Sequence, residues 1–413
     1  MPDTILSEQE LYQLTHHFQE QFSLERASQL VAATSISIVT EPGDRMAGAL
    51  TAALGRTSFL ELLVGGFQVS SVLDEINASQ AGETLQEVFG DLPGTLIDSR
   101  QRWLPRFSKQ SLTQTLQRSK QLGLAISLKE DSNWPAGLDD LGFGAPAVIF
   151  SQGNKRVLSL LASGVSIVGS RACTSYGLQV TEKLVAELGF SKRNTVSGGA
   201  IGIDSHVHNQ SLKQSLPTVA VMAGGLDRKY PSSNSRMFQA ILSEGALISE
   251  LAPGVAPSRW RFLQRNRLIA ALTPTTVVVE AGIRSGSIRT AHNAIELDRD
   301  LYAVPGPITS AASAGTNYLI AEGKAKALFD TKLITSSNTE VPHYQSGSAI
   351  QVRAQDALRD LRQATAEQIA KVAGLTEFEL GLAIAELKRM NQLTWHQDSS
   401  GSLHYALKYA YRA

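Results

Sequence analysis

Hydrophobic and polar residues alternate along the first 120 residues in a way that is typical of helices. Apolar side chains recur at helical spacing, as in Leu11, Leu14, Phe18 and Phe22. We therefore expect a small helical domain over residues 1–120, with helices of the SAM or helix-hairpin-helix type. Such helices either contact a DNA backbone or pack against a protein, and the pattern does not choose between the two.

The pattern changes over residues 121–335, where short runs rich in Val and Ile end in glycine and lead into amphipathic segments. This repetition is typical of successive βαβ units, and runs that are apolar throughout indicate strands buried on both faces. The predicted strands are Val165–Val168, Thr195–Ser197, Thr218–Met222, Ala246–Ser249, Thr275–Glu280 and Leu301–Val304. The fold class is therefore α/β, an extended Rossmann-like domain with a mostly parallel sheet.

A third pattern follows a polar, turn-rich stretch at residues 336–349, which we interpret as a linker. Over residues 350–413, one helix is predicted around Leu358, and capping boxes at Thr365 and Thr376 open two more. The terminal hairpin strands are predicted at Leu393–Gln397 and Leu403–Leu407. This order of elements predicts a winged helix.

The third helix of a winged helix usually reads duplex DNA. Here its first turns carry Glu377 and Glu379, with Glu386 further on, and these acids would repel phosphates. Lys388 and Arg389 come only near the end of the helix. The sequence therefore leaves DNA contact open beside protein interaction or a purely structural role.

The overall composition excludes several classes of protein. The chain has 413 residues and 38 basic against 38 acidic side chains, so any site for a polyanion must be a local patch. The single cysteine, Cys173, excludes an internal disulfide and a metal cluster of cysteines. The first residues include Asp3 and Glu8 instead of a secretory signal, and no apolar run is long enough to span a membrane. We expect a cytoplasmic protein without membrane insertion.

Two glycine-rich turns follow neighbouring predicted strands. The first contains Gly169, Ser170 and Arg171, and the second contains Ser197, Gly198 and Gly202. Glycine lets backbone amides approach an anion at a helix N-terminus, and the arginine adds a planar donor suited to phosphate or to base stacking. The two turns together predict one anion crevice, although a simple turn with a solvated arginine would also fit. Behind them, Asp204 is interpreted as a helix cap, and His206 and His208 as packing or surface residues.

The segment 259–267 has the strongest local charge, with four arginines, two aromatic residues and no acid. Basic groups that attract phosphates and aromatic rings that stack on bases are the combination used to bind single strands. The candidate contacts are Arg259, Phe262, Arg265, Asn266 and Arg267. The alternative is a surface helix with buried aromatic rings. Ser285, Gly286 and Ser287 form a third small-residue turn, which suits a phosphate contact or plain helix capping.

The order of these motifs resembles the DNA-processing protein A family, also called DprA or Smf. The resemblance rests on the three turns, on Arg265 to Ala270, on Ala303 to Gly306 and on Gly315 to Asn317. It implies single-stranded DNA binding, a homodimer formed through the central domain, protection of incoming DNA during natural transformation and loading of the RecA recombinase.

The same resemblance assigns roles to individual residues. Arg171 corresponds to a pocket arginine, Arg259 to a phosphate contact and Phe262 to a base-stacking ring, with Lys229 and Arg267 as additional contacts. The second turn departs from the family at Gly199 and Ile201, where many relatives have leucine and a basic residue. A contact is therefore either missing there or moved to Arg228 or Arg289.

Three rival functions remain. Lysine-decarboxylase-like phosphoribohydrolases, which are nucleotide-binding hydrolases, carry a catalytic glutamate where this chain has Thr290. A nicotinamide oxidoreductase would need GxGxxG in the first turn and an acid ending the second strand, and both are missing. A protein scaffold with solvated arginines is the third. We expect no enzyme activity and no cofactor.

Overall fold

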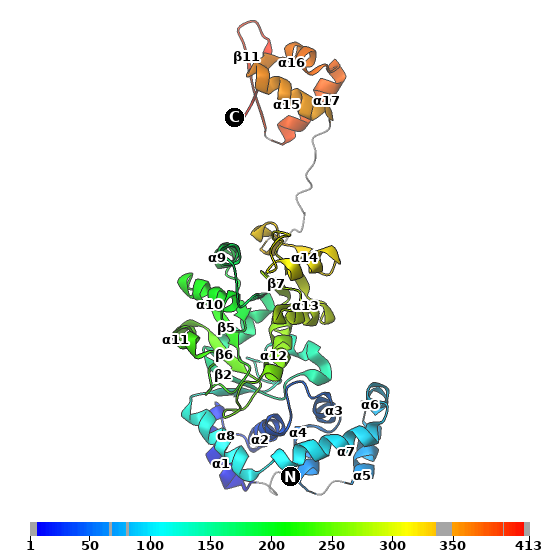
Figure 1. Ribbon diagram of the computed structural model, residues 1–413, viewed down its shortest axis with the longest axis vertical. Helices are drawn as coiled ribbons and strands as arrows, with labels where there is room; N and C mark the ends of the chain where they lie inside the picture. Colours follow the sequence, from blue (N-terminus) through cyan, green and yellow to red (C-terminus); the bar gives the residue numbers. More distant parts are fainter. Residues whose placement is uncertain (1–5, 66–67, 80–81, 336–348, 391, 409–413) are drawn as a thin grey trace. The chain divides into compact units, whose positions relative to one another are not determined.

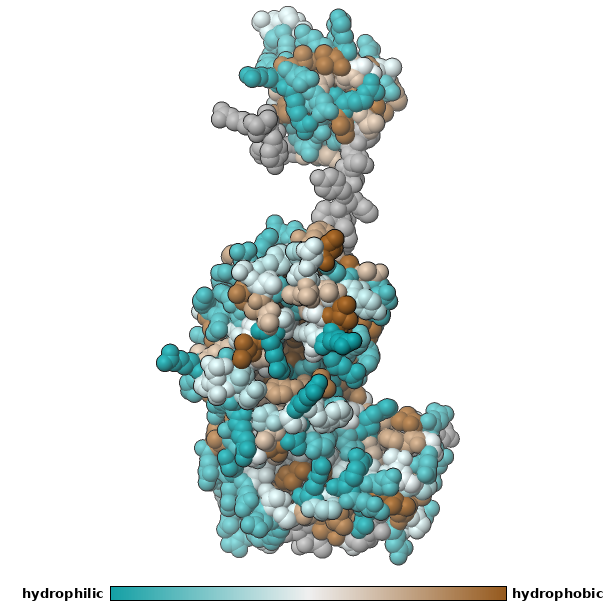
Figure 2. Space-filling model, viewed as in Figure 1, coloured by the Kyte–Doolittle hydropathy of each residue, from teal (hydrophilic) through white to brown (hydrophobic). Residues whose placement is uncertain are grey.

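The computed structural model describes residues 6–65, 68–79, 82–335, 349–390 and 392–408. They form two compact units, Met1–Ser336 and Ser337–Ala413. Residues 336–348 of the predicted linker lie outside the described residues, and its last residue, Ala349, begins a helix. The face of the protein drawn in Figure 2 is mostly hydrophilic with scattered apolar side chains.

The N-terminal part of the first unit is helical, as predicted. Its helices are α1 (Glu8–Thr15), α2 (Leu24–Val39), α3 (Arg45–Leu54), α4 (Arg56–Val64), α5 (Val69–Ala78), α6 (Gly82–Phe89), α7 (Leu92–Trp103) and α8 (Lys109–Gln121). Polar side chains begin several of them, as where Ser7 and Glu10 form a capping box at α1. One hydrophobic cluster joins Leu30 and Leu116 of these helices to Phe150 and Phe238 of the central part. The domain boundary at residue 120 therefore stays a prediction.

Among the described helices, none is by itself both long enough and apolar enough to cross a membrane. Taken together, α3 and α4 meet the length and composition expected of a membrane span, but the chain bends by 113° between them.

A nine-stranded sheet forms the centre of the first unit. Its strands are β1 (Ala125–Ser127), β2 (Ile149–Gly153), β3 (Val165–Val168), β4 (Thr195–Ser197), β5 (Thr218–Val221), β6 (Ala246–Ser249), β7 (Thr275–Val278), β8 (Asp300–Ala303) and β9 (Lys326–Ala327). Their spatial order is β1-β2-β6-β5-β4-β3-β7-β8-β9. The strands from β6 to β9 run parallel, whereas β2 pairs antiparallel with both β1 and β6. The predicted, mostly parallel sheet and its six strands are confirmed.

Helices cover both faces of this sheet (Figure 1). One set is α9 (Ser175–Phe190), α10 (Ile203–Lys213) and α11 (Ser235–Glu244), and the other is α12 (Arg259–Ala271), α13 (Gly286–Glu296) and α14 (Ala314–Ala321). The chain builds outward from β3 through β4, β5 and β6, and then returns to the other side of β3 at β7. Such a reversal leaves a crevice at the carboxyl ends of the strands, where ligands of open α/β sheets bind.

The C-terminal unit has its own small core. Its elements are α15 (Ala349–Leu361), β10 (Ala364–Thr365), α16 (Ala366–Ala373), α17 (Glu377–Arg389), β11 (Leu393–Gln397) and β12 (Leu403–Leu407). Both predicted capping boxes are formed, by Thr365 with Gln368 and by Thr376 with Glu379. The hairpin strands have the predicted bounds, and β10 adds a short third strand beside β12. The winged-helix assignment itself stays a prediction.

Candidate functional site

The three predicted turns meet at the carboxyl ends of β3, β4 and β7, beside the first turns of α12. Together they line a crevice of about 380 Å³. Its lining includes Gly169, Ser170, Arg171, Ala200, Asp204, Phe262, Arg265, Asn266, Ser285, Gly286, Ser287 and Thr290. The crevice is the one expected where the strand order reverses.

Glycine is required at two points behind the crevice, because the backbone there is crowded. Gly202 has φ +91°, and a Cβ on it would lie 2.3 Å from the carbonyl oxygen of Ser170. A Cβ on Gly198 would lie 2.4 Å from the guanidinium of Arg265. The second turn therefore packs directly against the first turn and against α12, and this packing fixes the positions of the two turns and the helix relative to one another.

A buried cation and a buried acid form the floor of the crevice. Arg265 is only 6% exposed, and its guanidinium donates hydrogen bonds to the carbonyl oxygens of Gly198 and Val221. Burial lowers the pKa of Arg265 to about 10, although Asp204 acts in the opposite direction. Burial raises the pKa of Asp204, opposed by Arg265 and by the backbone amides of Ala200 and Gly169. The positive charge of Arg265 is thus fixed in place and largely used within the protein.

The aromatic ring of Phe262 lies close to two arginines. The guanidinium carbon of Arg171 lies 5.4 Å from the centre of the ring, and that of Arg265 lies 5.8 Å away. Tyr230 contacts the same ring edge-on, with the ring centres 5.6 Å apart. Arg265 is buried, whereas Arg171 is exposed and forms no ion pair with any residue that the structure describes. The crevice therefore offers one free cation beside a fixed ring.

Hydrogen bonds between the turns hold the rest of the lining. The Ser287 hydroxyl donates to the carbonyl oxygen of Gly169 over 2.8 Å, and the Asn266 side chain donates to that of Gly286 over 3.1 Å. Ser285 caps α13 by accepting a hydrogen bond from the amide of Ser287. Ser285 therefore takes the capping role that had remained an alternative, while Gly286 lies in the first turn of a helix whose N-terminus faces the crevice.

The remaining predicted site residues lie outside the lining. Ser197 is buried and donates a hydrogen bond to the carbonyl oxygen of Ile167, so it supports the second turn from behind. Lys229 precedes Tyr230 and is partly buried, which lowers its pKa. Arg259 is exposed at the start of α12, one residue after its N-cap, Ser258.

The sequence predicts one concentration of charge from the arginines of the segment 259–267. In the structure, the four arginines of α12 do not form one basic surface. Arg261 forms an ion pair with Glu41 at 3.0 Å, and Arg267 pairs with the buried Glu250 and donates to the carbonyl oxygen of Gly144. The alternative of buried aromatic rings is also wrong, because Trp260 is 55% exposed. A helix turns its residues in all directions, so a run of like charges is divided among different neighbours.

Sequence reasoning misplaced one residue of the crevice. Asp204 was expected to cap α10, but the N-cap is Gly202, and Asp204 lies in the first turn with its carboxylate facing the crevice. Among the described residues of the lining it is the one acid. The sequence feature that could have placed Asp204 in the crevice is its position just after a glycine turn at the end of a strand. His208 is fully buried and bonded to Thr218, in agreement with its expected packing role.

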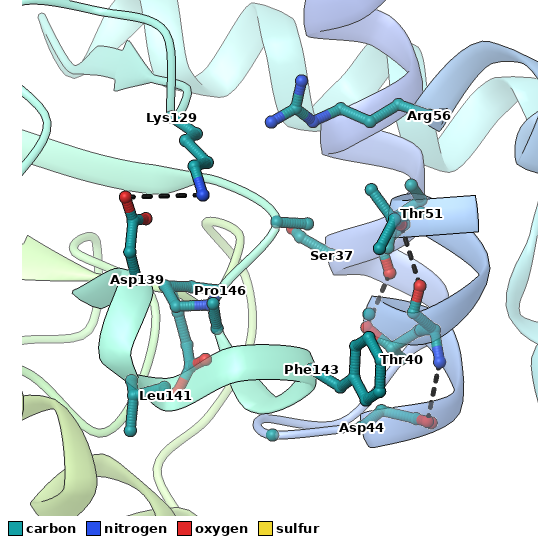
Figure 3. A pocket seen from close by; sticks show the side chains of 18 of the residues that line it. Ser37, Thr40, Asp44, Thr51, Arg56, Lys129, Asp139, Leu141, Phe143 and Pro146 are labelled. Carbon is teal, nitrogen blue, oxygen red and sulfur yellow. Dashed lines mark hydrogen bonds and ion pairs between the residues drawn. The ribbon is translucent and has the colours of Figure 1, made fainter. Parts of the chain in front are cut away.

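A second, larger cavity of about 1090 Å³ lies between α2, α3 and the segment 129–147 (Figure 3). Its two cations seen in Figure 3 are already paired, Lys129 with Asp139 at 3.4 Å and Arg56 with Glu130 at 2.9 Å. Thr51 donates its hydroxyl hydrogen to the backbone of its own helix. The acids among the lining residues outnumber the cations, so this cavity suits a polyanion less well than the crevice does.

The fold and the crevice define a Rossmann-like protein with a crevice at the carboxyl ends of its strands, lined by three turns, an exposed arginine and an aromatic ring. A family model described as DNA recombination-mediator protein A matches residues 125–338. The chain therefore belongs to the DNA recombination-mediator protein A family, as the sequence motifs indicated.

Individual relatives agree with this assignment. A putative DNA processing protein DprA of Mycobacterium tuberculosis is 43% identical over 204 residues, which cover 47% of this chain and 52% of the relative. The DNA processing protein DprA of Bacillus subtilis is 32% identical over 261 residues, 63% of this chain and 80% of the relative. The crystal structure of DprA from Streptococcus pneumoniae aligns with a TM-score of 0.57 at 27% identity, covering 74% of this chain and 95% of that one. The match spans about half the length of the mycobacterial relative.

Proposed function

We propose that this chain binds single-stranded DNA in the crevice, with a base stacked on Phe262 and a neighbouring phosphate held by Arg171. The observation that carries the proposal is the Phe262 ring, with the guanidinium carbons of Arg171 and Arg265 lying 5.4 Å and 5.8 Å from its centre, in a crevice of about 380 Å³ that residues of three turns line. Base stacking needs an unpaired base, so this arrangement favours single strands over duplexes.

The charges of the crevice support an anionic ligand. Arg171 is exposed and forms no ion pair with any described residue, whereas Asp204, the one acid among the described residues of the lining, faces the positive charge of Arg265. Arg259 and Lys229 extend the proposed contact away from the crevice. Ser197 holds the second turn through its side-chain hydroxyl, and Gly198 and Gly202 hold it through the close packing that they allow. Arg267 stabilises α12 from its other side.

The test is fluorescence anisotropy with a labelled oligothymidine and a duplex of equal length, over a series of salt concentrations. Wild type should prefer the single strand, with a log–log salt slope of about 0.7 for each neutralised phosphate. Phe262→Ala should weaken binding by about 1–3 kcal/mol with little change in slope, because stacking is lost. Arg171→Ala should weaken binding and should also lower the salt slope, because a phosphate contact is lost.

The matched control is Arg156→Ala, which removes an exposed arginine outside the crevice and should leave binding unchanged. Equal affinity for both oligonucleotides, or full binding by Phe262→Ala and Arg171→Ala, would contradict the proposal.

We further propose, on the family resemblance, that the chain acts without catalysis and without a cofactor in the cytoplasm. In this role it would form a homodimer, protect incoming single strands during transformation and load RecA onto them. The names of the relatives, DNA processing proteins, support this direction. Thr290, which stands where the phosphoribohydrolases have their glutamate, lines the crevice as a neutral side chain. Release of a free base from nucleoside monophosphates would contradict the non-catalytic role. RecA loading on protein-coated single strands that is the same with and without this chain would contradict the RecA role.

A further inference from the structure

The outward face of α17 is apolar, although α17 belongs to a small unit in water. The inward face buries Leu380, Ala383, Ile384 and Leu387 in the core of the C-terminal unit. On the opposite side of the helix lie Phe378, Gly381, Leu382 and Ala385, all of them exposed. Phe378 is 76% exposed and Leu382 is 50% exposed. A surface helix normally carries polar residues there, so this strip indicates a binding surface.

The shape of the strip suits another helix. Gly381 and Ala385 lie one turn apart along one edge of the strip, and Phe378 and Leu382 lie one turn apart along its other edge. A second helix can approach closely over small residues while large side chains pack at its sides. The acids at the start of α17 make duplex DNA a poor occupant of the same face.

Charges beside the strip are arranged with opposite signs at its two ends. Glu377 and Lys388 lie within about 20° of each other around the helix and roughly 16 Å apart along it. Glu377 forms no ion pair with any described residue, and Lys388 lies over the ring of Trp395 at 4.4 Å without an acid partner among them. Glu379 is used in the capping box, and Arg389 pairs with Glu386.

We propose that α17 binds α17 of a second copy of this chain in an antiparallel pair. A twofold axis midway between Glu377 and Lys388 brings Glu377 of each copy beside the Lys388 position of the other. It also places Leu382 of both copies next to the axis and Phe378 of each copy beside the level of Ala385 in the other. In a parallel pair the Glu377 and Lys388 of one copy would lie on the opposite side of the interface from those of the other copy, so the charges favour the antiparallel arrangement.

This contact is distinct from any dimer formed through the central sheet and does not depend on DNA binding. A single helix pair buries less than the roughly 1,200 Å² that stable dimers need, so the association is weak and is best captured covalently. Leu382→Cys, made in a Cys173→Ser background, places two thiols beside the proposed axis.

The experiment is mild oxidation of the full-length Leu382→Cys protein, followed by non-reducing electrophoresis. We expect a covalent dimer that forms at least about tenfold faster than with Lys371→Cys, which puts an exposed thiol on α16. Adding Phe378→Asp to Leu382→Cys should slow dimer formation by about tenfold or more, because the carboxylate would be buried against apolar groups. Equal rates for the two cysteine positions, or an unchanged rate with Phe378→Asp, would overturn the proposal.

A charge exchange tests the antiparallel orientation separately. Glu377→Lys should slow cross-linking at Leu382→Cys, and Glu377→Lys combined with Lys388→Glu should restore it. Circular dichroism of each variant establishes that the helix is still folded. Failure of the double exchange to restore cross-linking in a folded protein would reject the antiparallel pairing.

Discussion

Arg265 provides the sharpest test of how the crevice is built. Arg265→Met keeps most of the aliphatic volume but removes the guanidinium that donates to the carbonyl oxygens of Gly198 and Val221 and that faces Asp204. The loss leaves two buried carbonyl oxygens without this donor and Asp204 without the nearby positive charge, and removing such a buried charge costs about 3–5 kcal/mol. We therefore expect the free energy of unfolding of the first unit to fall by about this amount.

The cost should depend on Asp204 and on pH. Because burial already raises the folded-state pKa of Asp204, its contribution to stability decreases as pH rises from 3.8 through the folded value. Without Arg265 this pKa rises further, so Arg265→Met should be more damaging at pH 8 than at pH 5. Asp204→Asn should recover at least about 1 kcal/mol of the loss in a double-mutant cycle.

The assay is urea unfolding followed by tryptophan fluorescence. In a Trp395→Phe background the remaining tryptophans, Trp103, Trp134 and Trp260, all report on the first unit. A cost for Arg265→Met below about 1 kcal/mol, or strict additivity with Asp204→Asn, would refute the buried pair as the support of the crevice.

Three further predictions concern neighbouring residues. Burial lowers the pKa of His208 from 6.5 to about 3, so the free energy of unfolding should fall as pH drops below 6.5. At 1.36 kcal/mol per pKa unit, the full loss is about 5 kcal/mol. In urea unfolding, the stability of His208→Gln should therefore decrease less steeply with falling pH than that of wild type. Gly202→Ala should destabilise the first unit by more than about 1 kcal/mol in urea unfolding, because φ is +91° and the added Cβ meets the Ser170 carbonyl. Glu280→Gln should loosen the first turn, since the Glu280 carboxylate accepts hydrogen bonds from the amide and the hydroxyl of Thr174, and hydrogen exchange at residues 170–175 should be faster.

Each of these predictions has an outcome that contradicts it. Parallel acid limbs in wild type and His208→Gln would mean that another group controls acid unfolding. Wild-type stability of Gly202→Ala would show that the two turns can separate without cost. Unchanged exchange in Glu280→Gln would show that the turn is held by other contacts.

Local features were predictable because they depend on neighbours in the sequence. The strands β3 to β8 lie within one or two residues of their predicted bounds, since apolar runs ending in glycine have few alternatives in a parallel sheet. Both C-terminal capping boxes formed as predicted, because a capping side chain reaches only three residues along the chain. The glycine turns were also found from sequence, because Gly202 occupies a backbone conformation that other residues rarely adopt.

The use of each charged side chain was decided by the tertiary structure. The sequence shows four arginines in α12, but only packing sends Arg265 under the crevice, Arg261 to Glu41 and Arg267 to Glu250. Asp204 resembles a cap in the sequence, but α10 begins two residues earlier than a cap at Asp204 would imply, and Asp204 lines the crevice. Sequence by itself therefore determined the sheet, the turns and the family, whereas the fold determined which charges remain available to a ligand. The physical reason is that the effect of a charge depends on its burial and on partners that are distant in the chain.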